Sequence, residues 1–301
     1  MNPGLDATDE FSLLAGNAED VGLPWQGPPP VRRVSTDPGD GLRISSILWG
    51  EESPRLVFLH GGGQNAHTWD TVVLALGLPA LAVDLPGHGH SDWRPDRDYG
   101  PWTAAAAVEP AVRQWAPDAE VVVGMSLGGL TTIRLAAAAP DVVRRAVIVD
   151  VSPAALLRSA AMTRKERGTT ALIGDGRVFD TREEMIDNAV AAAPQRPRSS
   201  LERGVIHNTR QRPDGRWEWR YDLQGGPGGD YTPLWEDLGR TRAPMTLVRG
   251  GDSVFVADDD VEEFRRRKPD VDVQVVAGSG HSVQSDQPLV LAELIRSVLG
   301  A

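Results

Sequence analysis

The chain has 301 residues, no cysteine and a formal net charge of −11 at pH 7. Disulfides, thiolate metal sites and a cysteine nucleophile are therefore excluded. An acidic chain, with 42 Asp and Glu against 31 Lys and Arg, is not typical of a protein that binds nucleic acid, which requires a clustered excess of positive charge.

The first 30 residues predict an N-terminal arm on the protein surface. They contain no Lys or Arg, unlike a signal peptide, and they end in Gly27-Pro28-Pro29-Pro30, which neither a helix nor a central strand accommodates. The longest apolar stretch, residues 72–83, is broken by a glycine and a proline and is too short to span a bilayer. We therefore expect a soluble, cytoplasmic protein with no membrane partner.

Strand-like and helix-like segments alternate along most of the remaining chain. Eight strands are predicted from short apolar or alternating runs, at about residues 31–36, 42–49, 55–59, 80–84, 120–125, 144–150, 245–249 and 272–277. Helices are predicted between them, at about residues 66–76, 103–115, 127–139, 258–268 and 287–299. This alternation predicts an α/β fold with a mostly parallel, doubly wound, eight-stranded sheet and helices on both faces.

The alternation stops between the sixth and seventh predicted strands, where charged helical segments and one hairpin indicate an inserted, mainly helical cap. The chain is thus divided into an arm, a core and a cap, at residues 1–30, 31–152 with 243–301, and 153–242. The hairpin turn is Pro213-Asp214-Gly215. Trp217 and Trp219 follow it two residues apart and share one face, which either lines a substrate pocket or packs the cap onto the core.

The most informative motif joins the fifth strand to the helix after it. Three valines lead into Gly124-Met125-Ser126-Leu127-Gly128, and helix-like residues follow. In this context G-x-S-x-G is typical of a nucleophile elbow, a tight turn that lifts the serine hydroxyl above the sheet. Side chains at the two glycines would collide with neighbouring chain. Ser126 is therefore the candidate nucleophile.

A serine nucleophile requires a base that a third group orients, and donors for the oxyanion. His281 follows the last predicted strand in Gly278-Ser279-Gly280-His281, at the edge of the sheet where the elbow lies. Another strand ends in Leu59-His60-Gly61-Gly62-Gly63, whose glycines let backbone N–H groups approach a substrate. We predict His281 as the base, the N–H groups of Gly62 and Leu127 as the oxyanion hole, and a structural role for His60.

Together these motifs resemble those of the α/β-hydrolase fold family, in its serine esterase branch with a helical cap. The loop His60-Gly61-Gly62-Gly63, the loop from Asp84 to Ser91, the elbow at Ser126 and the loop ending at His281 follow the order of that family. The resemblance extends over about residues 31–299, apart from the cap. It implies a hydrolase with a Ser-His-Asp triad.

The triad acid is where the chain departs from the common family pattern. That pattern places the acid three residues after the glycine that ends the seventh strand, but Ser253 stands three residues after Gly250. Asp252 lies one residue early. Asp150, at the end of the sixth strand, is a second candidate, because some similar proteins carry the acid there and this strand neighbours the elbow strand. We favour Asp150 and keep Asp252 as the alternative.

A metal interpretation also arises from His88-Gly89-His90-Ser91-Asp92, which matches the start of a dinuclear zinc pattern. The sixth position, which should be another histidine, is Trp93, and the same stretch matches a structural loop of the resembled family. We therefore expect no metal and no cofactor.

The predicted function is hydrolysis of a carboxylic ester, lactone or thioester of a small molecule, through an acyl-enzyme on Ser126. One alternative is a cofactor-free haloperoxidase or perhydrolase, which uses the same triad with peroxide in place of water. An alternative of another class is a ligand-binding protein that keeps the fold without turnover. The intact nucleophile, base and oxyanion loop favour turnover.

Overall fold

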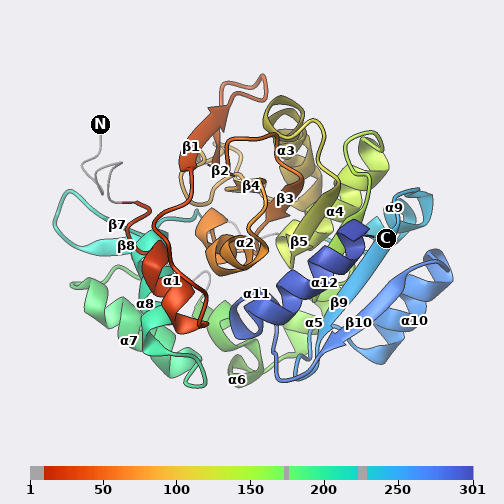
Figure 1. Ribbon diagram of the computed structural model, residues 1–301. Helices are drawn as coiled ribbons and strands as arrows, with labels where there is room; N and C mark the ends of the chain where they lie inside the picture. Colours follow the sequence, from red (N-terminus) through yellow and green to blue (C-terminus); the bar gives the residue numbers. More distant parts are fainter. Residues whose placement is uncertain (1–9, 173–175, 223–228, 301) are drawn as a thin grey trace.

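Eight strands form one sheet in the computed structural model, which describes residues 10–172, 176–222 and 229–300 (Figure 1). In order across the sheet they are β1 (Val31–Thr36), β2 (Ile44–Trp49), β4 (Ala80–Val83), β3 (Leu56–Leu59), β5 (Val121–Met125), β6 (Ala146–Val149), β9 (Met245–Gly250) and β10 (Asp272–Val276). β2 is antiparallel to both of its neighbours, and every pair from β4 to β10 is parallel. The predicted eight-stranded α/β sheet is confirmed.

Helices cover both faces of this sheet. Along β3, Val57 and Leu59 point to one face and Leu56 and Phe58 to the other. The first face packs against α3 (Pro101–Trp115), α4 (Leu127–Ala138), α9 (Leu234–Arg240) and α10 (Asp258–Arg267). The second packs against α1 (Leu14–Asp20), α2 (Asp70–Leu76), α11 (Val283–Asp286) and α12 (Pro288–Gly300). Because the central strands are buried on both sides, their sequences are continuous apolar runs.

The parallel strands end at one edge of the sheet, and this brings distant loops together. Leu59 at the end of β3 pairs with Gly124 of β5, and Met125 pairs with Val149 at the end of β6. Val149 in turn pairs with Val248 of β9. The segments that follow these strands contain the glycine loop, the elbow serine and the two candidate acids.

The chain between β6 and β9 forms short helices and a hairpin. These are α5 (Ala155–Ala161), α6 (Arg164–Arg167), η2 (Gly168–Leu172), α7 (Arg182–Ala192), α8 (Arg198–Asn208), β7 (Thr209–Gln211), β8 (Trp217–Trp219) and α9. α7 and α8 share a small apolar core that includes Met185 and Leu201. α9 instead packs on α4 and buries Leu234 and Leu238 in the main core. Ala155 and Leu156 of α5 also pack against that core, so the predicted cap range includes helices that pack with the core.

The N-terminal segment contacts both the core and α8. Leu14 of α1 is buried in the core cluster that contains Trp69, and Asp20 at the end of α1 forms an ion pair with Arg203 of α8. Figure 1 shows α1 beside α2 and α8. None of the helices in the described part of the chain is long and apolar enough to cross a membrane.

Candidate active site

Ser126 stands in a strained turn between β5 and α4. Its backbone has φ 51° and ψ −117°, a conformation that non-glycine residues rarely adopt and that costs on the order of 1–3 kcal/mol. A Cβ at Gly124 would lie 2.3 Å from the carbonyl oxygen of Gly128, and a Cβ at Gly128 would lie 2.2 Å from that of Leu59. Only glycine fits at these two positions, so the motif glycines are what allow the turn to form.

His281 and Asp150 lie in contact at the ends of two different strands. His281 Nδ1 is 2.8 Å from Asp150 Oδ2, and the aspartate is fully buried. The imidazole stacks on Phe255, with 3.6 Å between ring centroids. Since a carboxylate only accepts hydrogen bonds, Nδ1 carries the proton, and Nε2 of the neutral ring is left able to accept another.

The carboxylate of Asp150 is held by two more donors. The N–H of Gly250 donates to Oδ1 at 2.9 Å, and the hydroxyl of Ser253 donates to Oδ2 at 2.5 Å. Ser253 occupies the position where the common family pattern has the acid, and its hydroxyl donates to the candidate acid of the neighbouring strand. Asp252 is exposed, and its carboxylate makes no hydrogen bond or ion pair with other described residues.

The loop after β3 passes directly over the elbow. A Cβ at Gly61 would lie 3.2 Å from Ser126 Cβ, whereas a Cβ at Gly62 would meet no atom within 4 Å. The N–H of Gly62 has no acceptor among the described residues. Leu127 is the first residue of α4, where an N–H group has no acceptor within the helix. Both predicted oxyanion residues therefore offer N–H groups next to Ser126.

Hydrogen bonds fix both ends of this glycine loop. His60 Nε2 accepts from the N–H of Leu85 at 2.9 Å, so the ring proton is on Nδ1, which donates to the carbonyl of Gly61 at 2.8 Å. Burial, and next the neighbouring His88, lower the pKa of His60 to about 3, so its ring is neutral. At the other end, the Asn208 amide donates to the carbonyl of Gly63 at 2.6 Å.

The residues of the zinc-like pattern take part in loop contacts. His88 Nδ1 donates to the carbonyl of Pro86 at 2.9 Å, and the Asp92 carboxylate accepts from the N–H of Arg43 at 2.9 Å. Across the described ranges, the group of side chains close enough to share a metal ion lies elsewhere, at His67, Asp70 and His207. The sequence analysis missed this group. The only local signal is a histidine three residues before an aspartate.

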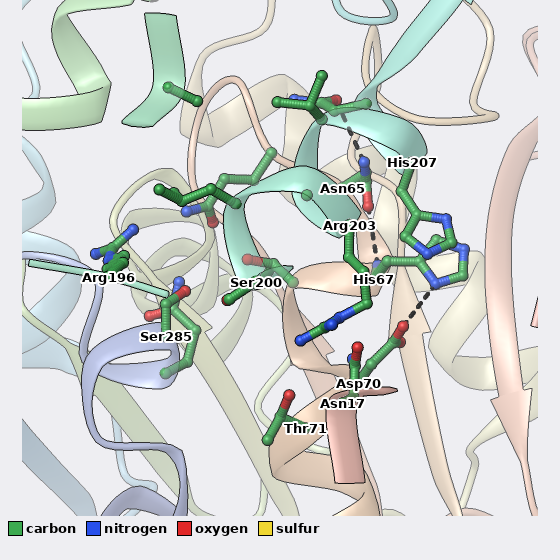
Figure 2. Close-up of a pocket in the computed structure, with 18 of the residues that line it drawn as sticks. Asn17, Asn65, His67, Asp70, Thr71, Arg196, Ser200, Arg203, His207 and Ser285 are labelled. Atoms are coloured by element: carbon green, nitrogen blue, oxygen red, sulfur yellow. Dashed lines mark hydrogen bonds and ion pairs between the residues drawn. The ribbon is translucent and has the colours of Figure 1, made fainter. Parts of the chain in front are cut away.

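A cavity of about 360 Å³ opens beside the glycine loop (Figure 2). Its wall is formed by that loop and by residues of α1, α2, α8 and α11, together with Trp219 and Tyr221, whose rings are stacked. Trp217 lies instead below the guanidinium of Arg182, which is 4.0 Å from its ring centroid, against the small core of α7 and α8. Of the two predicted pocket tryptophans, the structure places Trp219 at the cavity wall.

The chain belongs to the alpha/beta hydrolase family, whose model matches residues 56–294. Esterase Rv0045c of Mycobacterium tuberculosis is 54% identical to it over 98% of this chain and 97% of that protein. A solved structure of that esterase, described together with its inhibition by transition metals, covers 99% of this chain and 100% of its own at 53% identity and a TM-score of 0.87.

More distant relatives show the breadth of the family. The sn-1-specific diacylglycerol lipase ABHD11 of Mus musculus is 27% identical over 82% of this chain and 81% of that protein. The structure of E-2-(acetamidomethylene)succinate hydrolase, at 23% identity and a TM-score of 0.76, covers 90% of this chain and 100% of its own and shares the fold.

Proposed function

We propose that this chain hydrolyses a carboxylic ester, lactone or thioester of a small molecule through an acyl-enzyme on Ser126. Ester cleavage is supported by the identity with esterase Rv0045c along nearly the whole chain. The serine mechanism is supported above all by the hydrogen bond between His281 and the buried Asp150, at the sheet edge where Ser126 stands. The net charge of −11 and the lack of cysteine fit a cytoplasmic enzyme with no nucleic-acid partner.

In the first step, Ser126 Oγ attacks the carbonyl carbon while His281 Nε2 takes the hydroxyl proton. Asp150 holds the imidazole in the required tautomer and stabilises the imidazolium that forms. The N–H groups of Gly62 and Leu127 donate to the oxyanion, and such a donor is worth ~10²-fold to 10³-fold in rate. The imidazolium then protonates the leaving group, and the acyl group remains on Ser126.

In the second step, a water molecule attacks the acyl carbon. His281 takes one proton from that water and returns it to Ser126 Oγ as the carboxylic acid leaves. The same residues thus act twice, and no group outside the chain is required for the proton transfers.

The cavity supports a substrate with a polar part. Besides Trp219, its wall includes Asn65, Ser200 and Gln284. The Gln284 side chain is 1% exposed, and neither of its amide atoms has a hydrogen-bond partner among the described residues. A buried amide of this kind is satisfied by a ligand or by water. We expect esters that carry a hydrogen-bonding group on the acyl or alcohol part to be preferred over purely aliphatic ones of equal size.

The test is hydrolysis of p-nitrophenyl acetate and butyrate, combined with labelling by a fluorophosphonate probe. Ser126→Ala should abolish both, whereas Ser200→Ala, a serine at the cavity wall away from the elbow, should still react with the probe. Full activity in Ser126→Ala would show that the mechanism is wrong. Labelling of Ser126 with no turnover of any ester would favour the noncatalytic alternative, and peroxide-dependent bromination of monochlorodimedone would favour the haloperoxidase.

Regulation by metal ions is a further part of the proposal. Inhibition by transition metals is described for the M. tuberculosis esterase, and we propose that such ions inhibit this chain as well.

A further inference from the structure

A second cavity, of about 710 Å³, lies between the β7–β8 hairpin and the loop after β4. It shares no lining residue with the cavity beside the glycine loop. Its wall contains four arginines, one before β2 and three in or next to the hairpin: Arg43, Arg210, Arg212 and Arg220. The chain as a whole is acidic, with 42 Asp and Glu against 31 Lys and Arg, so a wall rich in guanidinium groups indicates a local site for an anion.

The guanidinium of Arg220 has no partner within the described ranges. It forms no hydrogen bond or ion pair there, and its Nε is buried. Burial is the chief reason that the pKa of Arg220 lies below its ordinary value, and an arginine stays protonated at neutral pH. Asp84 and Glu10 attract this charge, but each of them forms an ion pair with Arg33. A partly buried charge without a partner is unfavourable, and a bound anion would remove this cost.

The backbone directs the Arg220 side chain into this second cavity. The residues on either side of it, Trp219 and Tyr221, line the other cavity, and their rings stack. Neighbouring side chains of a strand point to opposite sides, and Arg220, which follows β8 directly, continues this alternation. Its N–H donates to the carbonyl of Asn208 at 2.8 Å, and its carbonyl accepts from Trp93 Nε1 at 3.3 Å. The backbone contacts therefore hold the residue in place without an ion pair of its side chain.

The other three arginines are only partly neutralised. Arg43 forms an ion pair with Asp92 at 3.3 Å. Arg210 and Arg212 share one carboxylate, that of Glu218, at 2.8 and 2.7 Å. The four guanidinium groups of the wall are thus paired with two carboxylates, which leaves two positive charges.

The remaining titratable groups near the wall do not change this excess. Asp214 lies 3.5 Å from Arg212, but it is closer to Arg216, at 2.8 Å, and Arg216 does not line the cavity. His90 does line it. Burial, and next the charge of Arg33, lower the pKa of His90 to about 4, so its ring adds no charge at neutral pH.

We propose that this cavity binds a phosphate monoester of a small molecule, and that Arg220 is the main contact of its phosphate group. A phosphate monoester carries close to two negative charges at pH 7, which matches the excess in the wall, whereas a carboxylate carries one. Guanidinium groups donate paired N–H groups to phosphate oxygens.

The size and lining of the cavity indicate a ligand larger than a free ion. A volume of about 710 Å³ is that of a small-molecule site. Trp93 in its wall is 37% exposed, with the Arg210 guanidinium 4.3 Å from its ring centroid, and offers an aromatic surface to the rest of the molecule. The inference does not rest on the proposed function, because the wall contains no residue of the proposed triad or oxyanion hole.

Binding is tested by isothermal titration of phenyl phosphate into the full chain, at constant ionic strength so that charge screening stays the same. Arg220→Gln should weaken the affinity at least about tenfold, because it removes a charged donor. Arg220→Lys should retain part of the affinity, since lysine keeps the charge without the paired N–H groups. The matched control is Arg240→Gln, which changes the net charge equally at an exposed position of α9 outside both cavities; it should bind like wild type. No binding to wild type, unchanged binding in Arg220→Gln, or an equal loss in Arg240→Gln overturns the site.

Thermal unfolding distinguishes a ligand site from a structural role of Arg220. Because its guanidinium makes no hydrogen bond or ion pair in the described part of the chain, Arg220→Gln should keep or raise the Tm without ligand. Phenyl phosphate at about 100 times its Kd should raise the Tm of wild type and of Arg240→Gln by several degrees, and should leave that of Arg220→Gln unchanged. A lower Tm in Arg220→Gln, with the ligand-dependent rise intact, would mean that Arg220 only supports the fold.

Two further titrations test the chemical class of the ligand. Benzoate, which has the same ring and one negative charge, should bind at least about tenfold more weakly than phenyl phosphate. Inorganic phosphate should also bind more weakly, because it lacks a group that could contact Trp93. Benzoate binding as tight as that of phenyl phosphate would refute the preference for a dianion. Inorganic phosphate binding equally tightly would refute the monoester.

Discussion

Asp150 combines two features that are rarely found in one residue. It has a positive φ of 49° and a fully buried carboxylate that receives three hydrogen bonds. Its position just after β6 puts it beside the elbow strand, while the donors that fix it come from the last residue of β9 and from the loops after β9 and β10. A strained, buried and fully satisfied carboxylate is the kind of group that holds a histidine in one orientation.

Replacement of each candidate acid by asparagine, in separate variants, distinguishes their roles. Asp150→Asn should lower kcat by about 10⁴-fold, because an amide at this position stabilises the wrong tautomer of the histidine. Asp252→Asn should stay within about twofold of wild type, since its exposed carboxylate makes no contact with His281 among the described residues. The measurement is kcat on p-nitrophenyl butyrate. A large loss in Asp252→Asn would reverse the assignment.

Ser253 offers a milder test of the same arrangement. Ser253→Ala removes one donor from the Asp150 carboxylate, and a hydrogen bond to a charged group contributes about 1.5–3 kcal/mol. We expect kcat to fall by about tenfold, with KM almost unchanged and with Ser253→Thr restoring most of the rate because it keeps the hydroxyl. If Ser253→Ala raised KM alone, the residue would contact substrate and not Asp150.

Among the elements, α4 is the helix whose start is most constrained. Gly128→Ala would place a Cβ 2.2 Å from the carbonyl oxygen of Leu59 on β3, and such overpacking costs about 1–3 kcal/mol or more. We expect a Tm lower by several degrees and loss of probe labelling at Ser126. Gly204→Ala is the matched control, because its Cβ in α8 meets no atom within 4 Å. It should raise stability by up to about 1 kcal/mol, and equal effects of the two substitutions would contradict this account.

The elements were predictable where local sequence determines them. Patterns of a few residues are enough to predict the strand β5 from its valine run, the elbow from the glycines around Ser126 and the hairpin from the turn at 213–215. The α1 helix was not predicted, because its short segment is stabilised by burial of Leu14 and by the ion pair of Asp20 with Arg203 of α8. Contacts of this kind depend on packing between distant parts of the chain.

At the scale of the whole molecule, the candidate functional sites also divide into those that local sequence determines and those that depend on contacts between distant residues. The residues proposed as a triad could be named from motifs, since parallel strands bring their loops to one edge. The role of Ser253 as a donor to Asp150 could not be predicted from motifs, because the two residues are 103 positions apart in the sequence. The cluster of His67 with His207 could not be predicted either, because these residues are 140 positions apart. Local patterns carry no information on such pairs.

The buried histidines make the folded molecule sensitive to acid, and His60 is the clearest case. Its pKa is about 3 in the fold, chiefly through burial, against 6.5 for an unperturbed histidine. In the unfolded chain the His60 imidazole is protonated below about pH 6.5, whereas in the folded chain it stays neutral down to about pH 3. The free energy of unfolding therefore decreases as the pH falls from 6.5 to 3. Between pH 6.5 and 4.5 this group alone contributes a loss of about 2 kcal/mol.

His60→Gln removes this titration while its side-chain oxygen can still accept from the N–H of Leu85. Urea unfolding at pH 7.5 and 4.5 should show a smaller loss of stability in the variant than in wild type, by about 2 kcal/mol. Titrating groups that do not interact with His60 contribute equally to both proteins and cancel in the comparison. An identical loss in the two proteins would mean that His60 is protonated in the fold, and then it could not accept the hydrogen bond from Leu85 that anchors the glycine loop.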